Sequence, residues 1–363
     1  MKILHVITDL NTGGAEKLLV DLLPRLDEKA LKVELCLFNG VTTPFLESLT
    51  NKGIKIHKLG TKSDYYNPKH ILQLIKLARR FDVVHTHNTT PQLFGAIASI
   101  FCKKLWVTTE HTTTSHRRVW WYRPIERWMY RRYTRIICIS DAAANAVRSI
   151  IGTQLSNIGI ISNGVDILKY KCAQPIDRTQ IGRPIHNKKI ILMVGRYSYQ
   201  KDQATIIKAL KSLPNEIELW LVGYGETENT LRTLAHDLKV VDRVMFLGMR
   251  TDVPELLKTA DIVIQSSHIE GFGLAAVEAM AAGIPVLASD IPGLHDVVDG
   301  AGLLFEHEND RQLANHISNL FENQTLYNEL AYKGLKRAAE YSIDQMAENY
   351  TMVYNQCIHP TIN

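Results

Sequence analysis

Residues 261–290, DIVIQSSHIEGFGLAAVEAMAAGIPVLASD, contain the order of elements that decides the fold. A strand-like apolar run covers 261–267, a glycine-rich turn opens a short alanine-rich helical pattern, and a second strand-like run covers 284–289. A strand, a helix and a second strand within so short a stretch are typical of a βαβ unit, in which the two strands are parallel. The stretch therefore predicts an α/β fold with a parallel sheet.

The same alternation extends through the chain in both directions. Amphipathic helical patterns separate short apolar runs at 2–8, 32–38, 54–60, 82–87, 104–111, 135–140, 158–162, 188–195, 218–223, 244–248 and 302–305. Right-handed crossovers between parallel strands place helices on both faces of a sheet, which predicts doubly wound, Rossmann-like domains. The alternation breaks over 163–187, where prolines and scattered charges indicate a linker between two domains.

Length and composition exclude several classes of protein. A chain of 363 residues is long for one core, and 45% hydrophobic and 22% charged residues are ordinary globular values. No apolar run approaches the roughly 18 to 20 residues that span a bilayer. The first residues, MKILHVITDL, have the pattern of a strand and not of a signal peptide. Together with five cysteines that form no CxxC pair, these features predict a cytoplasmic protein.

Charge is distributed unevenly along the chain. The formal net charge of +5 divides into +11 for residues 1–165 and −6 for the remainder. Much of the excess lies in HRRVWWYRPIERWMYRRYTR, residues 116–135, which interleaves arginines with tryptophans and tyrosines. Arginine and interfacial aromatic side chains suit an anionic membrane surface, although a solvated helix or a nucleic-acid site has a similar composition.

Three loops that follow predicted strands carry candidate binding residues. Asn11-Thr12-Gly13-Gly14-Ala15-Glu16 opens a helix after the first strand, and Gly195 to Asp202 carries Arg196 and Lys201, which suit phosphate oxygens. In 266–290, Glu270 precedes Gly271-Phe272-Gly273-Leu274 at a helix start, and Glu278 lies about one turn into that helix. Backbone amides at a helix start bind anions, whereas the two carboxylates suit sugar hydroxyl groups.

The 266–290 segment resembles the signature of glycosyltransferase family 4, which are retaining enzymes of the GT-B fold. Weaker matches extend the resemblance over nearly the whole chain: the turn at 13–14, His111 after a strand, 161–166, 195–201 and 222–225. The resemblance implies two domains that face a central cleft. It also implies that the last helix returns to the first domain, so the domains are 1–165 with 343–363, and 166–342. Met346, Tyr350 and Val353 recur at the helical spacing that this requires.

In the family, a sugar nucleotide binds mainly to the second domain. The resemblance implies that Arg196 and Lys201 hold the diphosphate and that Glu278 takes the ribose hydroxyls. It implies that Glu270 and the amides of Phe272 to Leu274 hold the transferred sugar.

The first domain contributes less to donor binding in the family. The resemblance implies that the glycine turn at 13–14 faces the diphosphate across the cleft and that His111 lies close to the transferred sugar. It thus assigns catalysis to His111, Glu270, Arg196 and Lys201. The implied donor-binding set is Gly13, Gly14, Arg196, Lys201, Glu270, Gly271, Phe272, Gly273, Leu274 and Glu278. Glu110 stands where the family often has a second histidine, and the loop 292–296 lacks the usual glycine pair and glutamate.

These features predict a glycosyltransferase that moves a sugar from a nucleotide sugar to a glycan or lipid-linked acceptor, with retention, in cell-surface polysaccharide synthesis. We expect no cofactor and no metal, because Arg196, Lys201 and a helix N-terminus can stabilise the leaving diphosphate. His85, His87 and His111 invite a metal interpretation, but no carboxylate or cysteine completes a ligand set at useful spacing. We expect segment 116–135 to attach the protein peripherally to the inner face of the membrane.

Two alternatives remain open at this stage. A nucleic-acid-binding protein would use segment 116–135 but would leave the glutamates and glycines of 266–290 without a role. Another GT-B-like enzyme, such as an epimerase or a phosphorylase, would share the cleft without needing the 266–290 signature in this form. We therefore expect no nucleic-acid partner.

Overall fold

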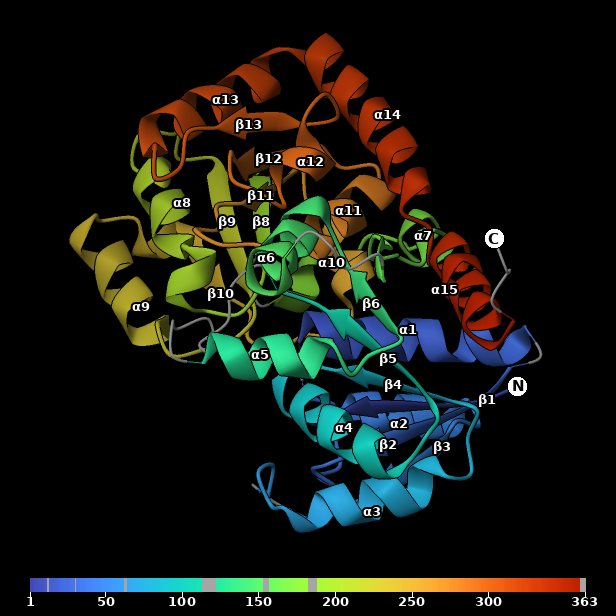
Figure 1. Cartoon of the computed structure of the whole chain (residues 1–363). Helices are drawn as coiled ribbons and strands as arrows, with labels where there is room; N and C mark the ends of the chain where they lie inside the picture. Colours follow the sequence, from blue (N-terminus) through green and yellow to red (C-terminus); the bar gives the residue numbers. More distant parts are fainter. Residues whose placement is uncertain are drawn as a thin grey trace. The chain divides into compact units, whose positions relative to one another are not determined.

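The computed structural model describes residues 1–11, 13–29, 31–61, 64–112, 122–152, 157–181 and 188–359. Internal contacts divide the chain into two compact units (Figure 1). Unit 1 is Met1–Gly164 with Ile343–Asn363, and unit 2 is Val165–Ser342. The division lies one residue before the boundary expected from the sequence. Each unit is built on its own parallel sheet with helices on both faces, which confirms the predicted fold class.

In its described residues, unit 1 has a seven-stranded sheet in the order β3-β2-β1-β4-β5-β6-β7. The strands are β1 (Lys2–Ile7), β2 (Lys32–Leu37), β3 (Lys55–Lys58), β4 (Val83–His87), β5 (Leu105–Glu110), β6 (Arg135–Cys138) and β7 (Ile158–Ile160). The helices are α1 (Gly14–Glu28), α2 (Pro44–Asn51), α3 (Lys69–Ala78), α4 (Thr89–Phe101), α5 (Arg123–Tyr130), α6 (Asp141–Ile151) and α15 (Ile343–Ile358).

The last helix of the chain belongs to the core of unit 1. Helix α15 lies beside α1 (Figure 1), and both pack on the face of the sheet that carries Ile3, Val83 and Val107. Tyr350 and Tyr354 of α15 are fully buried in this core. The first strand and the last helix therefore enclose the same apolar layer, although they lie at opposite ends of the sequence.

In its described residues, unit 2 has a six-stranded sheet in the order β10-β9-β8-β11-β12-β13. The strands are β8 (Lys189–Val194), β9 (Ile217–Val222), β10 (Val244–Phe246), β11 (Ile262–Gln265), β12 (Val286–Ser289) and β13 (Leu303–Phe305). The helices are α7 (Ile167–Lys171), α8 (Gln203–Leu210), α9 (Glu228–Asp237), α10 (Val253–Thr259), α11 (Leu274–Ala281), α12 (His295–Val298), α13 (Asp310–Glu322) and α14 (Gln324–Glu340).

The strand order of each sheet reverses at one place. In unit 1 the chain runs outward from β1 in one direction and then resumes at β4 on the other side; in unit 2 the same reversal separates β8 from β11. Loops on the two sides of such a reversal diverge and leave room for a ligand at the carboxyl ends of the strands. The topology therefore directs attention to the residues that follow β1, β4, β8 and β11.

The stretch predicted as a linker contains α7, whose Tyr170 is buried in unit 2, so the segment is partly helical and packed, whereas residues 182–187 lie outside the described ranges. A helix of five residues is too short to show a period in the sequence, which explains the difference. Among the residues described, no helix combines the length and the apolar character needed to cross a membrane.

Candidate active site

An ion pair joins the loops that follow β8 and β11 in unit 2. Lys201 precedes α8, Glu270 follows β11, and the Lys201 ammonium donates a hydrogen bond to the Glu270 carboxylate. The side chains are 25% and 16% exposed, so the pair is sheltered but reachable. Its two loops are joined by backbone contacts, since His268 N donates to Gln200 O at 2.8 Å. Two of the predicted site residues thus meet at the strand-order reversal.

Helix α11 begins directly beyond this ion pair. Gly273 precedes the helix with φ of 91°, in the left-handed region that favours glycine, and a Cβ there would lie 2.7 Å from the Leu294 side chain. Within the described residues, the amides of Phe272, Gly273 and Leu274 donate to no other group of the protein. Free amides at a helix start carry partial positive charge and can bind anionic or hydroxyl oxygens. The predicted binding role of 272–274 therefore has a matching local geometry.

Three other predicted residues of unit 2 have distinct surroundings. Phe272 is buried against Tyr341, with ring centroids 5.1 Å apart in an edge-to-face arrangement, so its side chain anchors the loop while its amide remains available. Glu278 is buried in α11, with an exposed fraction of 4%. Arg196 is 69% exposed, and the nearest carboxylate that it meets is Glu226 at 4.0 Å. The structure therefore does not bring Arg196 into the Lys201–Glu270 pair.

Glycines keep the loops after β8 and β9 in close contact. A Cβ on Gly223 would lie 2.0 Å from the carbonyl oxygen of Gly195, and one on Gly225 would lie 2.1 Å from the carbonyl oxygen of Tyr197. Because backbone atoms cannot give way as flexible side chains do, only glycine fits at these two positions. The loop that carries Arg196 therefore packs closely against the backbone of residues 222–225.

In unit 1 the glycine turn after β1 is linked to the end of β4. Gly13 precedes α1, and Glu16 in the first turn accepts a hydrogen bond of 3.0 Å from the Asn88 amide group. Burial raises the pKa of Glu16 above its ordinary value, an effect that the hydrogen bond from Asn88 opposes. Asn88 itself has φ of 65° and ψ of 167°, a backbone conformation that is ordinarily confined to glycine. Thr12 lies outside the described residues, and Gly14 is the first residue of α1.

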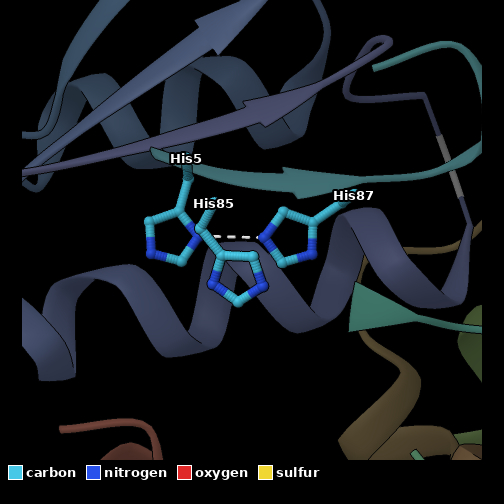
Figure 2. A group of neighbouring side chains, drawn as sticks. All are labelled: His5, His85 and His87. Carbon is cyan, nitrogen blue, oxygen red and sulfur yellow. Dashed lines mark hydrogen bonds between the residues drawn. The ribbon is translucent and has the colours of Figure 1, made fainter. Parts of the chain in front are cut away.

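His111 follows β5 and is part of a cluster of histidines. Its Nε2 lies 3.0 Å from Nδ1 of His87, and Nε2 of His87 lies 2.9 Å from Nδ1 of His5. Figure 2 shows the rings of His5, His85 and His87 gathered on one face of the sheet, with a dashed line between His5 and His87. The Nδ1 atom of His111 is buried and has no partner among the described residues. Burial lowers the pKa of His111 to about 4.

Glu110, which stands beside His111, has a structural explanation. Its carboxylate accepts hydrogen bonds from the Tyr130 hydroxyl at 2.6 Å and from the Thr112 hydroxyl at 3.1 Å. The side chain is buried, with 6% exposed. Glu110 therefore ties α5 to the end of β5.

The described part of the basic and aromatic segment forms α5. Residues 113–121, which include Arg117, Arg118, Trp120 and Trp121, lie outside the described ranges. Arg123 and Arg127 of α5 and Arg131 at its C-terminal cap are exposed at helical spacing, and Trp128 beside them is 38% exposed. Met129 and Tyr130 on the other side are fully buried. The helix thus has one buried face and one face of arginine and tryptophan, which we call the α5 face.

Sequence reasoning missed several residues that the structure places with the predicted ones. His5 joins the cluster because β1 and β4 pair with His5 opposite His85, which requires the strand order to be known. Asn88 could have been noticed because it directly follows a strand end, where open parallel sheets bind ligands. Tyr350 and Tyr354 could be predicted as core residues of α15 but not as partners of histidines.

Two units, each with a parallel sheet and one strand-order reversal, have the architecture of the GT-B fold. Two family models agree with this class: "Glycosyltransferase Family 4" matches residues 12–168 and "Glycosyl transferases group 1" matches residues 177–337. The chain belongs to family 4 of the retaining glycosyltransferases and has the GT-B fold.

Individual relatives are distant but consistent with this family. The chain is 29% identical over 235 residues to an uncharacterized glycosyltransferase of Methanocaldococcus jannaschii, covering 60% of each chain. It is 29% identical over 244 residues to the UDP-Gal:alpha-D-GlcNAc-diphosphoundecaprenol alpha-1,3-galactosyltransferase of Escherichia coli, covering 62% of each. The chain thus spans about three fifths of the length of these curated relatives.

Solved structures share the fold over almost the whole chain. The crystal structure of Anabaena HepE in complex with UDP has a TM-score of 0.84 and 23% sequence identity to this chain, and the match covers 98% of this chain and 100% of that one. At this level of identity the likeness concerns the arrangement of the elements.

Proposed function

We propose that the chain transfers a sugar from a nucleotide-sugar donor to a glycan or lipid-linked acceptor, with retention of the anomeric configuration. The observation that carries the proposal is the Lys201–Glu270 pair beside the free amides of 272–274. One ammonium, one carboxylate and several amides suit a ligand with both phosphate and hydroxyl groups. UDP is the first nucleotide to test, because HepE was crystallised with UDP and the Escherichia coli relative is named for a UDP-sugar.

The proposed residues have two chemical tasks in this reaction, to stabilise the leaving diphosphate and to hold the donor's hydroxyl groups, and the start of α11 contributes to both. The bond between the anomeric carbon and the diphosphate oxygen breaks, the acceptor oxygen bonds to that carbon, and the acceptor proton leaves with the nucleoside diphosphate. Lys201, Arg196 and the N-terminus of α11 stabilise the charge that grows on the diphosphate. Glu270 and the amides of 272–274 hold the transferred sugar, and Glu278 accepts from the ribose hydroxyls. In unit 1, Gly13 and Gly14 contribute to diphosphate binding and His111 to sugar binding.

The first experiment separates the donor class from nucleic acid. Thermal unfolding is followed with UDP, GDP and ADP and, in parallel, with single- and double-stranded oligonucleotides, and donor hydrolysis is then screened across a nucleotide-sugar panel. We expect one nucleoside diphosphate to raise the unfolding temperature and one nucleotide sugar to be hydrolysed. Stabilisation by oligonucleotides alone would favour the nucleic-acid alternative, and conversion of the donor without transfer to any acceptor or water would favour an epimerase.

We further propose that the reaction needs no divalent metal. The support is the presence of Lys201, Arg196 and the start of α11, which can supply the positive charge that Mg²⁺ would otherwise give. Activity should persist after dialysis against EDTA and should not rise when Mg²⁺ or Mn²⁺ is added. Loss of activity with EDTA and recovery with Mn²⁺ would contradict the proposal.

For the acceptor, we propose a lipid-linked glycan that is met at an anionic membrane surface, with the protein held peripherally on its cytoplasmic side. Support comes from the α5 face, where Arg123, Arg127 and Arg131 accompany the half-exposed Trp128. The name of the Escherichia coli relative includes a diphosphoundecaprenol acceptor. Basic residues near anionic lipid contribute about 1 kcal/mol each, which is enough for reversible attachment when several act together.

Liposome co-sedimentation tests the membrane proposal. Binding should require anionic lipid, weaken with salt, and fall when Arg123, Arg127 and Arg131 are replaced by serine. A matched control replaces Lys76, Arg79 and Arg80, three exposed basic residues at the end of α3 in the same unit, and should bind nearly as the wild type does. Equal loss in both triple variants would indicate an effect of net charge alone, and absence of binding to any vesicle would leave a soluble acceptor as the better explanation.

A further inference from the structure

An unbroken line of hydrogen-bonded side chains crosses the core of unit 1 and ends at His111. It runs from Tyr350 to Thr109 (3.0 Å), to His85 (2.8 Å), to Tyr354 (2.7 Å), to His5 (3.3 Å), to His87 (2.9 Å) and to His111 (3.0 Å). We call these seven side chains the histidine relay. The strands β1, β4 and β5 supply four of its members, His111 directly follows β5, and α15 supplies both tyrosines. Figure 2 shows the three central rings.

Every ring in the relay is neutral at ordinary pH. Burial lowers the pKa of His5 to about 3 and of His111 to about 4, and it holds those of His85 and His87 well below the usual histidine value. A neutral imidazole has one nitrogen that donates and one that accepts. Each ring must therefore donate to one neighbour and accept from the other. Donation then runs either from Tyr350 toward His111 or from His111 toward Tyr350, and the groups at the two ends decide which.

The Tyr350 end decides between the two directions. The Tyr350 hydroxyl is fully buried, and in the described part of the chain its one hydrogen-bond partner is Oγ1 of Thr109. If the line ran toward Tyr350, Thr109 would donate to it and the Tyr350 proton would be left without an acceptor in the core, which is costly. If the line runs from Tyr350, that proton is satisfied, and the donor left without a partner is Nδ1–H of His111. This atom is also buried, but it belongs to a partly exposed residue directly after β5, where a ligand can supply the acceptor.

We propose that the histidine relay holds His111 as the Nδ1–H tautomer, so that this ring offers a hydrogen-bond donor to a hydroxyl oxygen of the transferred sugar. Tyr350 and Tyr354 are then positioning residues for His111. The assignment of the sugar as the acceptor rests on the proposed function, whereas the tautomer does not. His111 in this state cannot act as a base through Nδ1, because that nitrogen already carries a proton.

A metal ion is the competing use of the same residues. Ligand atoms of His5, His85 and His87 lie within 4.8 Å of one another, and a cation there would take nitrogens that now accept or donate hydrogen bonds within the relay. Three neutral histidines can hold zinc, but here each ring would have to give up the nitrogen that accepts a hydrogen bond within the relay. Elemental analysis of the purified protein distinguishes a metal site from a hydrogen-bonded relay. One equivalent of zinc or another transition metal would overturn the relay proposal.

Nitrogen-15 NMR of histidine-labelled protein measures the tautomer directly, whether or not the protein is active. The His111 signals are identified by their absence from His111→Asn. We expect a proton-bearing shift at Nδ1 and a bare-nitrogen shift at Nε2 in the wild type. The opposite assignment in the wild type would overturn the proposal without the use of any further variant.

Tyr354→Phe breaks the line between His85 and His5, and Tyr350→Phe removes the donor that sets its direction. In both variants His111 should become a mixture of tautomers, and kcat/KM should fall about two- to tenfold, the range for loss of one neutral hydrogen bond. Tyr133→Phe is the matched control, because this buried hydroxyl bonds to Thr86 on the same strand but on the opposite face of the sheet. It should keep the wild-type tautomer. An unmixed Nδ1–H tautomer in both relay variants would show that the relay does not set it.

Discussion

Replacing Gly293 by alanine tests whether the loop between β12 and α12 holds Glu270 in its place. Gly293 has φ of 91°, and a Cβ on it would lie 2.5 Å from the carbonyl oxygen of Glu270 and 3.1 Å from the carbonyl carbon of Gly271. Real Cβ contacts essentially never fall below 3.0 Å, so one of the two backbones must move by about 0.5 Å. The neighbour is backbone and not a flexible side chain, so the displacement falls on the residue that pairs with Lys201.

Gly300→Ala provides a matched control in the same unit. Gly300 also has a positive φ, of 74°, but a Cβ there would meet nothing within 4 Å. Both variants carry the strain of an alanine in the left-handed region, which is about 1–2 kcal/mol. The difference between them therefore isolates the displacement of the Glu270 loop.

The assay pairs urea unfolding with UDP titration and steady-state kinetics. Gly300→Ala should lose about 1–2 kcal/mol of unfolding free energy and keep its activity. Gly293→Ala should lose more, and its kcat should fall about 10- to 100-fold, because misplacement of a catalytic group by a fraction of an ångström to one ångström has effects of this order. Equal kinetics in the two variants would refute the view that Gly293 positions Glu270.

Lys201→Met should lower kcat about 100-fold or more with a smaller change in the KM for the donor, because charge on the diphosphate grows as its bond breaks. Lys201→Arg should recover part of the lost kcat, and a change confined to KM would count against this role. Burial lowers the pKa of His5 to about 3 and of His111 to about 4, below the 6.5 of an unfolded histidine, so the unfolded state binds more protons below pH 6.5. The unfolding free energy should then fall between about pH 6.5 and pH 4, by about 1.4 kcal/mol per pH unit for each such ring, and urea midpoints that do not change from pH 7 to pH 5 would contradict it. Asn88→Ala should destabilise the protein more than Asn88→Gly, because φ is 65° at this position, and urea midpoints in the reverse order would remove that explanation.

Much of the fold could be predicted from the sequence because the residues that begin and end its helices and strands act locally. In the stretch 261–290, β11, α11 and β12 lie where the apolar runs and glycines predicted them. The glycines at 271 and 273 and the apolar strand that precedes them act over a few residues, so no knowledge of the tertiary structure was needed. The strand order, by contrast, is decided by packing between elements that are far apart in the chain.

The same distinction explains which site contacts were missed. Lys201 and Glu270 were each named from their own loops, but their ion pair depends on β8 and β11 being neighbours in the sheet. The loop 292–296 departs from the family pattern, yet Gly293 lies against the backbone of Glu270. A departure in sequence therefore does not mark a loop as remote from the site, because this contact needs only a residue without a Cβ at position 293 and the backbone of Glu270.

The histidine relay and the sheet topology identify the same end of unit 1 by independent criteria. Burial of polar side chains in an apolar core is unfavourable unless each finds a hydrogen-bond partner, and six bonds satisfy the seven members of the relay at every junction. The one atom left over is Nδ1 of His111. It lies just after β5, at the carboxyl edge where open parallel sheets bind ligands. The unpaired atom was found from hydrogen bonds alone, and the ligand-binding edge was found from strand order alone. Because both criteria lead to His111, we infer that a ligand, and not only core packing, explains the unpaired atom.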